Sequence, residues 1–133
     1  MCMGSGMPAA AGKLLQVLVV EDDALIAEDL AQTVAEMGAA VVGIAACAEE
    51  AVRLAAEHRP GVVLMDIRLR GVSDGIEAAK AIRAMVDPVI IFCSGNGDCT
   101  TRRRISAFGN AQLLLKPVNA EELVQAIGQA RQA

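Results

Sequence analysis

The feature of this 133-residue chain that most constrains its fold is a repeated alternation between short apolar runs and segments with helical spacing. The apolar runs lie at residues 15–20, 40–44, 62–65, 89–93 and 111–115. The segments after them carry apolar residues three and four positions apart, which predicts helices at residues 24–37, 47–58, 74–85, 98–108 and 119–132. Strands that alternate with helices in this way pair in parallel through right-handed crossovers.

The composition fits such a sheet. Hydrophobic residues make up 54% of the chain, mostly small aliphatic ones, and the only aromatic residues are Phe92 and Phe108. Parallel strands that helices cover on both faces read as continuous aliphatic runs. The sequence therefore predicts a flavodoxin-like, doubly wound α/β fold: a (βα)5 three-layer sandwich with the strand order 2-1-3-4-5.

Length and charge limit the classes of protein. We expect one domain over residues 14–133, preceded by a flexible lead at residues 1–13 that lacks the features of a secretion signal. No apolar stretch reaches the ~20 residues of a membrane span, so a cytoplasmic location is expected. The net charge of −4 disfavours a nucleic-acid partner, and we interpret the basic run at residues 102–104 as a solvated helix face.

The cysteines and the single histidine do not form a metal or disulfide pattern. There is no CxxC pair, and His58 precedes Arg59-Pro60 at an expected helix end. We interpret Cys47 and Cys93 as small, buried or half-buried hydrophobic residues.

Polar residues follow four of the five predicted strands. Glu21 and Asp22 come after the first, Asp66 after the third, Ser94 after the fourth and Lys116 after the fifth. In a doubly wound sheet the carboxyl ends of the strands form one crevice near the switch point in strand order. We therefore expect three carboxylates, a hydroxyl and an ammonium in a single site.

Clustered carboxylates repel one another, and a divalent cation relieves that repulsion. Mg²⁺ prefers oxygen ligands, so Asp22 and Asp66 are the predicted direct ligands. Glu21 is expected to hold a metal-bound water, and the backbone carbonyl of Arg68 is expected to complete the protein's share.

The same residues suit phosphoryl transfer. A carboxylate can act as the nucleophile and form an aspartyl phosphate. In this interpretation Asp66 attacks the phosphoryl group, Lys116 pairs with one of its oxygens and Ser94 hydrogen-bonds another. A plainer reading also exists for some acids, since Asp22 or Asp23 could cap the helix at residues 24–37, as Asp74 is expected to cap the helix that it precedes.

With these residues in place, the chain resembles the receiver domain of bacterial two-component response regulators. The resembling motifs, which lie within residues 15–131, are VLVVEDD at residues 17–23, VLMDIRL at 63–69, DGIEA at 74–78, PVIIFCSG at 88–95 and LLKP at 114–117. The resemblance assigns the acidic pair to Glu21 and Asp22, the phosphoacceptor to Asp66, the switch hydroxyl to Ser94 and the lysine to Lys116.

The resemblance also implies partners. The phosphodonor would be a sensor histidine kinase or a phosphotransfer protein, and Mg²⁺ would be the cofactor. A downstream protein would bind the surface formed by residues 98–108, 111–115 and 119–132. No DNA-binding output domain is expected in this chain, and whether it forms a homodimer stays open.

One residue departs from the family pattern. Many receivers carry Tyr or Phe three residues before the lysine, where this chain has Leu113. The aromatic half of the usual switch is therefore absent. Phe92-Cys93-Ser94-Gly95 resembles the Phe-Ala-Thr-Gly-type motif of some single-domain receivers, which also lack the aromatic residue.

Three alternatives compete with a phosphorylated receiver. A pseudo-receiver would be a protein-interaction module that never uses phosphate, which Leu113 favours and the intact acidic and basic residues disfavour. A phosphatase of the haloacid dehalogenase type would need Asp-x-Asp, but Asp66-Ile67-Arg68 lacks the second acid. A flavodoxin is disfavoured because the acidic loop after the first strand would repel a phosphate group.

Overall fold

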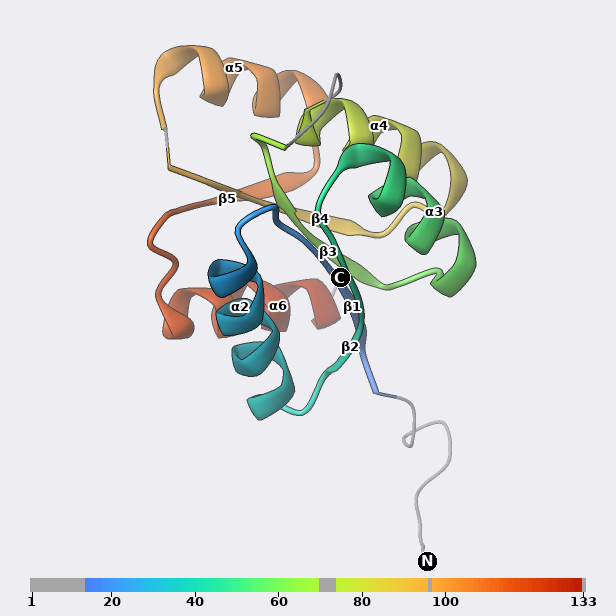
Figure 1. Cartoon of the computed structure of the whole chain (residues 1–133). Helices are drawn as coiled ribbons and strands as arrows, with labels where there is room; N and C mark the ends of the chain where they lie inside the picture. The colour runs from blue at the N-terminus through green and yellow to red at the C-terminus, as the bar shows by residue number, and fades with distance from the viewer. Residues whose placement is uncertain (1–13, 70–73, 96, 133) are drawn as a thin grey trace, which may run out of the picture.

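The computed structural model describes residues 14–69, 74–95 and 97–132. Five parallel strands form one sheet in the order β2-β1-β3-β4-β5, which confirms the predicted order (Figure 1). The strands are β1 (Gln16–Val20), β2 (Ala40–Ala45), β3 (Val62–Asp66), β4 (Val89–Ser94) and β5 (Ala111–Leu115). The helices are α2 (Ala24–Glu36), α3 (Ala48–His58), α4 (Gly75–Met85), α5 (Cys99–Phe108) and α6 (Ala120–Gln132).

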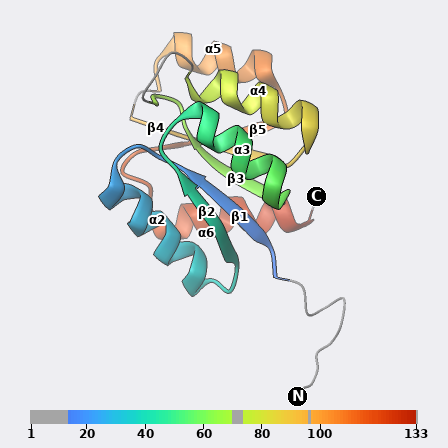
Figure 2. The same cartoon turned by 45° about the vertical axis from the view of Figure 1, so that its right-hand side comes forward.

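The helices cover both faces of the sheet, as predicted. Helices α3, α4 and α5 lie on one face and α2 and α6 on the other (Figures 1 and 2). Alternate residues of each central strand therefore enter different cores: Leu18, Val63 and Phe92 face the first group, whereas Val19 and Leu64 face the second. All five residues of β3 are buried, as expected for a strand covered on both faces.

Carboxylates and one glycine set several helix ends. Asp23, Asp74 and Asp98 are the N-caps of α2, α4 and α5, and each accepts hydrogen bonds from backbone N–H groups of the first turn. Gly38 follows the end of α2 with a φ of 90°, which glycine adopts without strain. Cys47 and Asp98, predicted as the first residues of their helices, are instead the caps that precede them.

Helix α5 has the smallest apolar anchor of the five. Ile105 is its one buried residue, and Phe108 at its end is half-buried with its ring edge-on to Phe92, 5.3 Å between centroids. Arg102 and Arg103 are exposed as predicted, but Arg104 is not solely a solvated residue, because its guanidinium pairs with Asp74 at 2.6 Å. Polar contacts therefore supply much of what holds α5 in place.

The predicted burial of two cysteines is confirmed. Cys93 is buried and Cys47 is half-buried. Burial raises the pKa of the Cys93 thiol to about 12, so it stays protonated and behaves as a small hydrophobic residue. In the part of the chain that the structure describes, every helix is too short or too polar to cross a bilayer. The expected lead at residues 1–13 lies outside the described residues.

Candidate functional site at the carboxyl ends of the strands

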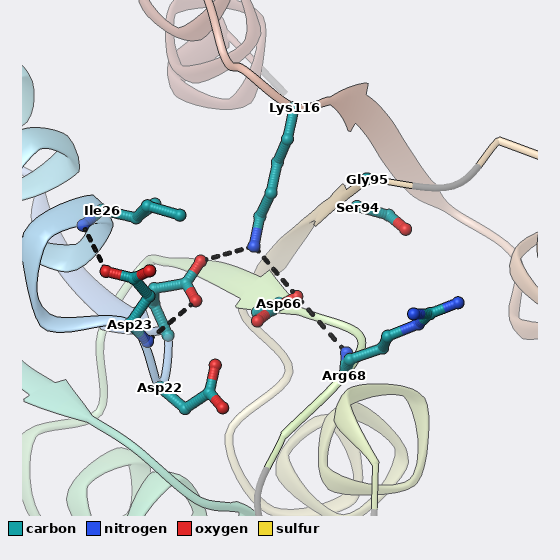
Figure 3. A pocket seen from close by; sticks show the side chains of 9 residues that line it. Asp22, Asp23, Ile26, Asp66, Arg68, Ser94, Gly95 and Lys116 are labelled. Atoms are coloured by element: carbon teal, nitrogen blue, oxygen red, sulfur yellow. Dashed lines mark hydrogen bonds and ion pairs between the residues drawn. The ribbon is translucent and has the colours of Figure 1, made fainter.

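A pocket of about 570 Å³ opens at the carboxyl edge of the sheet (Figure 3). Every site residue predicted from the sequence lines it. The lining residues are Glu21, Asp22, Asp23, Ile26, Asp66, Arg68, Ser94, Gly95 and Lys116. The predicted convergence of strand ends is therefore what the fold produces.

The three consecutive acids after β1, at residues 21–23, lie in different environments. The N–H of Glu21 donates to the carbonyl of Ala45 at 2.8 Å, which fixes Glu21 beside the end of β2. Glu21 is buried, and its Oε2 accepts a hydrogen bond from the N–H of Asp23 at 3.1 Å. Asp23 is exposed, and its carboxylate accepts from the N–H groups of Leu25 and Ile26. Asp23 is thus the cap of α2, the plainer of the two readings weighed from the sequence.

Three carboxylates come together in the pocket. Glu21, Asp22 and Asp66 each offer one oxygen, and these oxygens all lie within 4.8 Å of one another. Glu21 and Asp66 are buried, with Asp66 only 5% exposed. Among the described residues this is a set of oxygen donors compact enough to surround one divalent cation.

Lys116 supplies positive charge to the pocket. Its Nζ lies 2.7 Å from Oε1 of Glu21 and 3.3 Å from Oδ1 of Asp66. Burial lowers the pKa of the lysine, but the two carboxylates outweigh that effect and the pKa lies above its usual value. The ammonium therefore stays charged at neutral pH.

Backbone pairing places Ser94 next to this lysine. The N–H of Lys116 donates to the carbonyl of Ser94 at 2.8 Å, which continues the pairing of β4 with β5 past the end of the strand. Ser94 is buried at the last position of β4. Figure 3 shows its side chain on the β4 side of the pocket, across from Asp22.

The environment of Asp66 disfavours its negative charge. The pKa of this carboxyl is raised to about 6: burial contributes most, the hydrogen bond and the charge of Glu21 add to the rise, and Lys116 offsets part of it. A single ammonium thus does not balance the carboxylates. Added positive charge between Glu21, Asp22 and Asp66 would relieve the repulsion, so the donor set fits a divalent metal ion.

The chain leaves Asp66 through a tight contact with α4. The N–H of Arg68 donates to Oδ1 of Asp66 at 3.3 Å, and the N–H of Gly75 donates to the carbonyl of Ile67 at 2.7 Å. A Cβ built on Gly75 would lie 2.0 Å from the carbonyl oxygen of Asp66. The first residue of α4 therefore packs directly on the backbone of Asp66, a contact that no local pattern around Asp74-Gly75 indicates.

Leu113 lies outside the pocket. It is half-buried on β5 and packs against the core beneath α3, α4 and α5. The predicted loop after Arg68 lies largely outside the described residues, as does Asn96, so neither can be placed. The ligand role predicted for the backbone carbonyl of Arg68 stays a prediction.

Comparison with known proteins identifies the family. The sequence profile of the response regulator receiver domain matches residues 17–128. The chain therefore belongs to the response regulator receiver domains, as its resemblance implied.

Curated relatives are similar over most of this chain. It is 37% identical over 114 residues to the transcriptional regulatory protein PdtaR of Mycobacterium tuberculosis, a match that covers 84% of this chain and 54% of that protein. It is 35% identical over 118 residues to the response regulator GacA of Pseudomonas aeruginosa, covering 87% of this chain and 55% of that protein. The chain thus spans about half the length of these relatives.

Solved structures support the same assignment. The signal receiver domain of a modulated diguanylate cyclase from Desulfovibrio desulfuricans superposes with a TM-score of 0.82 at 37% identity, covering 89% of this chain and 94% of that one. The response regulator domain of Thermotoga maritima CheB superposes with a TM-score of 0.81 at 30% identity, covering 91% of this chain and 98% of that one.

Proposed function

We propose that this receiver domain accepts a phosphoryl group on Asp66 from a histidine kinase or a phosphotransfer protein. The observation that carries the proposal is the position of the Asp66 carboxylate. It is buried at the end of β3, within 4.8 Å of oxygens from two other carboxylates, and 3.3 Å from the Lys116 ammonium. The crevice above it is open enough to admit a phosphoryl group.

Mg²⁺ is the cofactor that this donor set favours. Asp22 and Asp66 would bind it directly, Glu21 would bind it directly or through water, and the Arg68 carbonyl is the fourth proposed donor. When bound, the metal supplies positive charge that offsets the carboxylates and the phosphoryl oxygens.

The protein's own residues divide the remaining work. An oxygen of Asp66 forms the new P–O bond while the P–N bond to the donor histidine breaks, and the histidine nitrogen keeps that electron pair. Lys116 pairs with one phosphoryl oxygen, and the Ser94 hydroxyl donates a hydrogen bond to another. The domain takes up one phosphoryl group, and hydrolysis then moves that group to water, which releases inorganic phosphate and restores the free Asp66 carboxylate.

The output of this transfer is a switched protein surface. Ser94 and Lys116 precede α5 and α6, so new partners for these two side chains displace the surface formed by α5, β5 and α6. Because Leu113 stands in place of an aromatic residue, that displacement does not involve the rotation of an aromatic side chain at this position. We propose a downstream protein as the ligand of this surface and the cytoplasm as the place where the two meet.

Acetyl phosphate tests the proposal without a cognate kinase. The wild-type chain, incubated with acetyl phosphate and Mg²⁺, should gain the mass of one phosphoryl group by intact-mass spectrometry. Asp66→Asn should gain none, whereas Asp23→Asn, which keeps a capping side chain on α2, should label like the wild type.

Two results would contradict the proposal. Equal labelling of Asp66→Asn would move the phosphoacceptor elsewhere. No labelling of the wild type by acetyl phosphate, together with no response to beryllofluoride, would favour the alternative of a phosphorylation-independent interaction module.

A further inference from the structure

We infer that the ion pair between Arg104 and Asp74 is a latch that holds α5 in its unphosphorylated position and so opposes the switch. The inference rests on the proposed function, because it concerns how phosphorylation at Asp66 moves α5. It assigns a regulatory role to two side chains that take no part in the chemistry of the pocket.

The latch joins α5 to the backbone behind the phosphoacceptor. One terminal nitrogen of Arg104 lies 2.6 Å from Oδ2 of Asp74, while Oδ1 of Asp74 accepts from the N–H groups of Ile76 and Glu77. Asp74 is therefore fixed by its own helix and offers its second oxygen to α5. The residue after it, Gly75, packs on the carbonyl of Asp66.

Charge makes the pair stable at neutral pH. Burial raises the pKa of Asp74, but the N–H of Glu77 and the guanidinium of Arg104 outweigh burial, so the pKa lies below its usual value. The carboxylate is thus ionised in the resting protein. With side chains 40% and 32% exposed, the pair contributes modestly to stability, which suits a contact that must open.

The far end of α5 is held more firmly. Arg83, in the last turn of α4, donates to the carbonyls of Phe108, Gly109 and Asn110 at 3.3, 2.6 and 2.8 Å. Its guanidinium carbon also lies 3.9 Å from the centroid of the Phe108 ring. These contacts make the C-terminal end of α5 the pivot.

The loop from Ser94 connects to the opposite end of α5. The carbonyl of Gly97 accepts a hydrogen bond from Nε of Arg102 at 2.8 Å, so Gly97 is attached to the first turns of the helix. Gly95 is exposed, and a Cβ built on it would have no atom within 4 Å. Neighbouring atoms therefore do not pack on Gly95, and the Gly97–Arg102 hydrogen bond joins the approach to α5 to its first turns, so a shift of Ser94 carries these turns with it.

These contacts place the strain of switching on the latch. When Ser94 moves toward a phosphoryl oxygen on Asp66, α5 rotates about its Arg83 end. Arg104 moves with the helix, but Asp74 stays with α4, so the ion pair separates. A contact present in one state only shifts the equilibrium toward that state, and removing it shifts the equilibrium the other way.

Beryllofluoride binding in Mg²⁺ measures this shift without a kinase. Arg104→Gln should bind the phosphoryl mimic about 2- to 5-fold more tightly than the wild type, the factor expected for loss of a half-exposed ion pair from the resting state. Asp74→Asn, which still caps α4, should show a similar gain. The double variant should gain no more than either single variant, because both remove the same contact.

A matched control separates the latch from surface charge in general. Lys80→Gln removes an ion pair within α4, in which Nζ of Lys80 lies 3.2 Å from Oε2 of Glu77. This ion pair does not reach α5. This variant should bind beryllofluoride like the wild type. Chemical shifts of α5 amides should also move toward their beryllofluoride-bound positions in unliganded Arg104→Gln, a readout that a purely structural role would not produce.

The outcomes distinguish the two proposals. If the wild type responds to beryllofluoride but Arg104→Gln binds it equally or more weakly, the latch is wrong and the proposed function stands. The latch is also wrong if Lys80→Gln gains as much affinity as Arg104→Gln. If the wild type shows no response at all, the proposed function fails and the latch fails with it.

Discussion

The surroundings of the Asp66 carboxyl oppose its ionisation. This carboxyl is buried beside Glu21, and the resulting pKa of about 6 lies well above the ordinary 3.8. A carboxyl that binds a metal cation gains from such an environment, because the cation neutralises negative charge that the fold alone leaves poorly balanced. The clustered carboxylates therefore contribute part of the driving force for binding a cation.

This shift predicts a pH-dependent stability. Because the pKa of Asp66 is higher in the folded chain than its ordinary 3.8, the folded state binds the proton more tightly, and its advantage is lost as the pH rises from about 4 through about 6. In EDTA at pH 8, the free energy of unfolding of Asp66→Asn should therefore be about 1 to 3 kcal/mol higher than that of the wild type. Urea denaturation across pH measures this difference, which should shrink toward pH 4; growth on acidification would contradict it.

At this scale the sequence predicted the pocket well and its surroundings poorly. Glu21, Asp66, Ser94 and Lys116 could be found because each directly follows an apolar run, and the topology of a parallel sheet brings those ends together. The role of Arg104 could not be found in this way, because its partner lies 30 residues away in the sequence. The residue also stands in a basic run, which by local charge alone is expected to be solvated. Only tertiary structure shows that contact.

Among the secondary-structure elements, α4 and α6 each contain a glycine, and the two differ in the space available for a side chain. Gly75 begins α4 where any side chain would collide with the backbone of Asp66, whereas a Cβ on Gly128 in α6 would have no atom within 4 Å. The first glycine is required by packing. The second leaves helix propensity unused.

Alanine at these two positions should therefore have effects of opposite sign. Gly75→Ala should cost about 2 to 4 kcal/mol, because the backbone at Asp66 must shift to admit the methyl group. Gly128→Ala should gain about 0.5 to 1 kcal/mol from helix propensity and reduced entropy of the unfolded chain. Thermal or urea unfolding of both variants against the wild type checks the prediction; a stable Gly75→Ala would mean that α4 does not pack on Asp66 as described.

The starts of α2 and α4 were predictable because their caps are local signals, whereas Asp98 was expected as the first residue of α5 and is its cap. Asp23, Asp74 and Asp98 each stand one residue before a helix, where a carboxylate satisfies free N–H groups. What the sequence could not predict is how firmly each helix is attached. The single buried residue of α5 and the Arg83 contacts at its end depend on packing between helices.

For the whole molecule, a ligand that binds only the folded pocket adds to the stability of the fold. If Mg²⁺ binds there with a dissociation constant of about 1 mM, then about 10 mM Mg²⁺ should raise the free energy of unfolding by about 1.4 kcal/mol. Asp22→Asn should lose most of this gain, and Asp23→Asn should keep it because Asp23 serves α2. Urea titrations with Mg²⁺ and with EDTA measure the effect; an equal gain in both variants would place the metal elsewhere.

Lys116 is already occupied before any phosphoryl group arrives. Its ammonium lies 2.7 Å from Glu21 and 3.3 Å from Asp66, so a phosphoryl oxygen replaces an existing partner rather than meeting a free cation. The lysine can bias the two conformations only by the difference between its old and new partners. Such an exchange gives a small free-energy difference between the resting and the phosphorylated conformation. A small difference keeps the conformational change readily reversible.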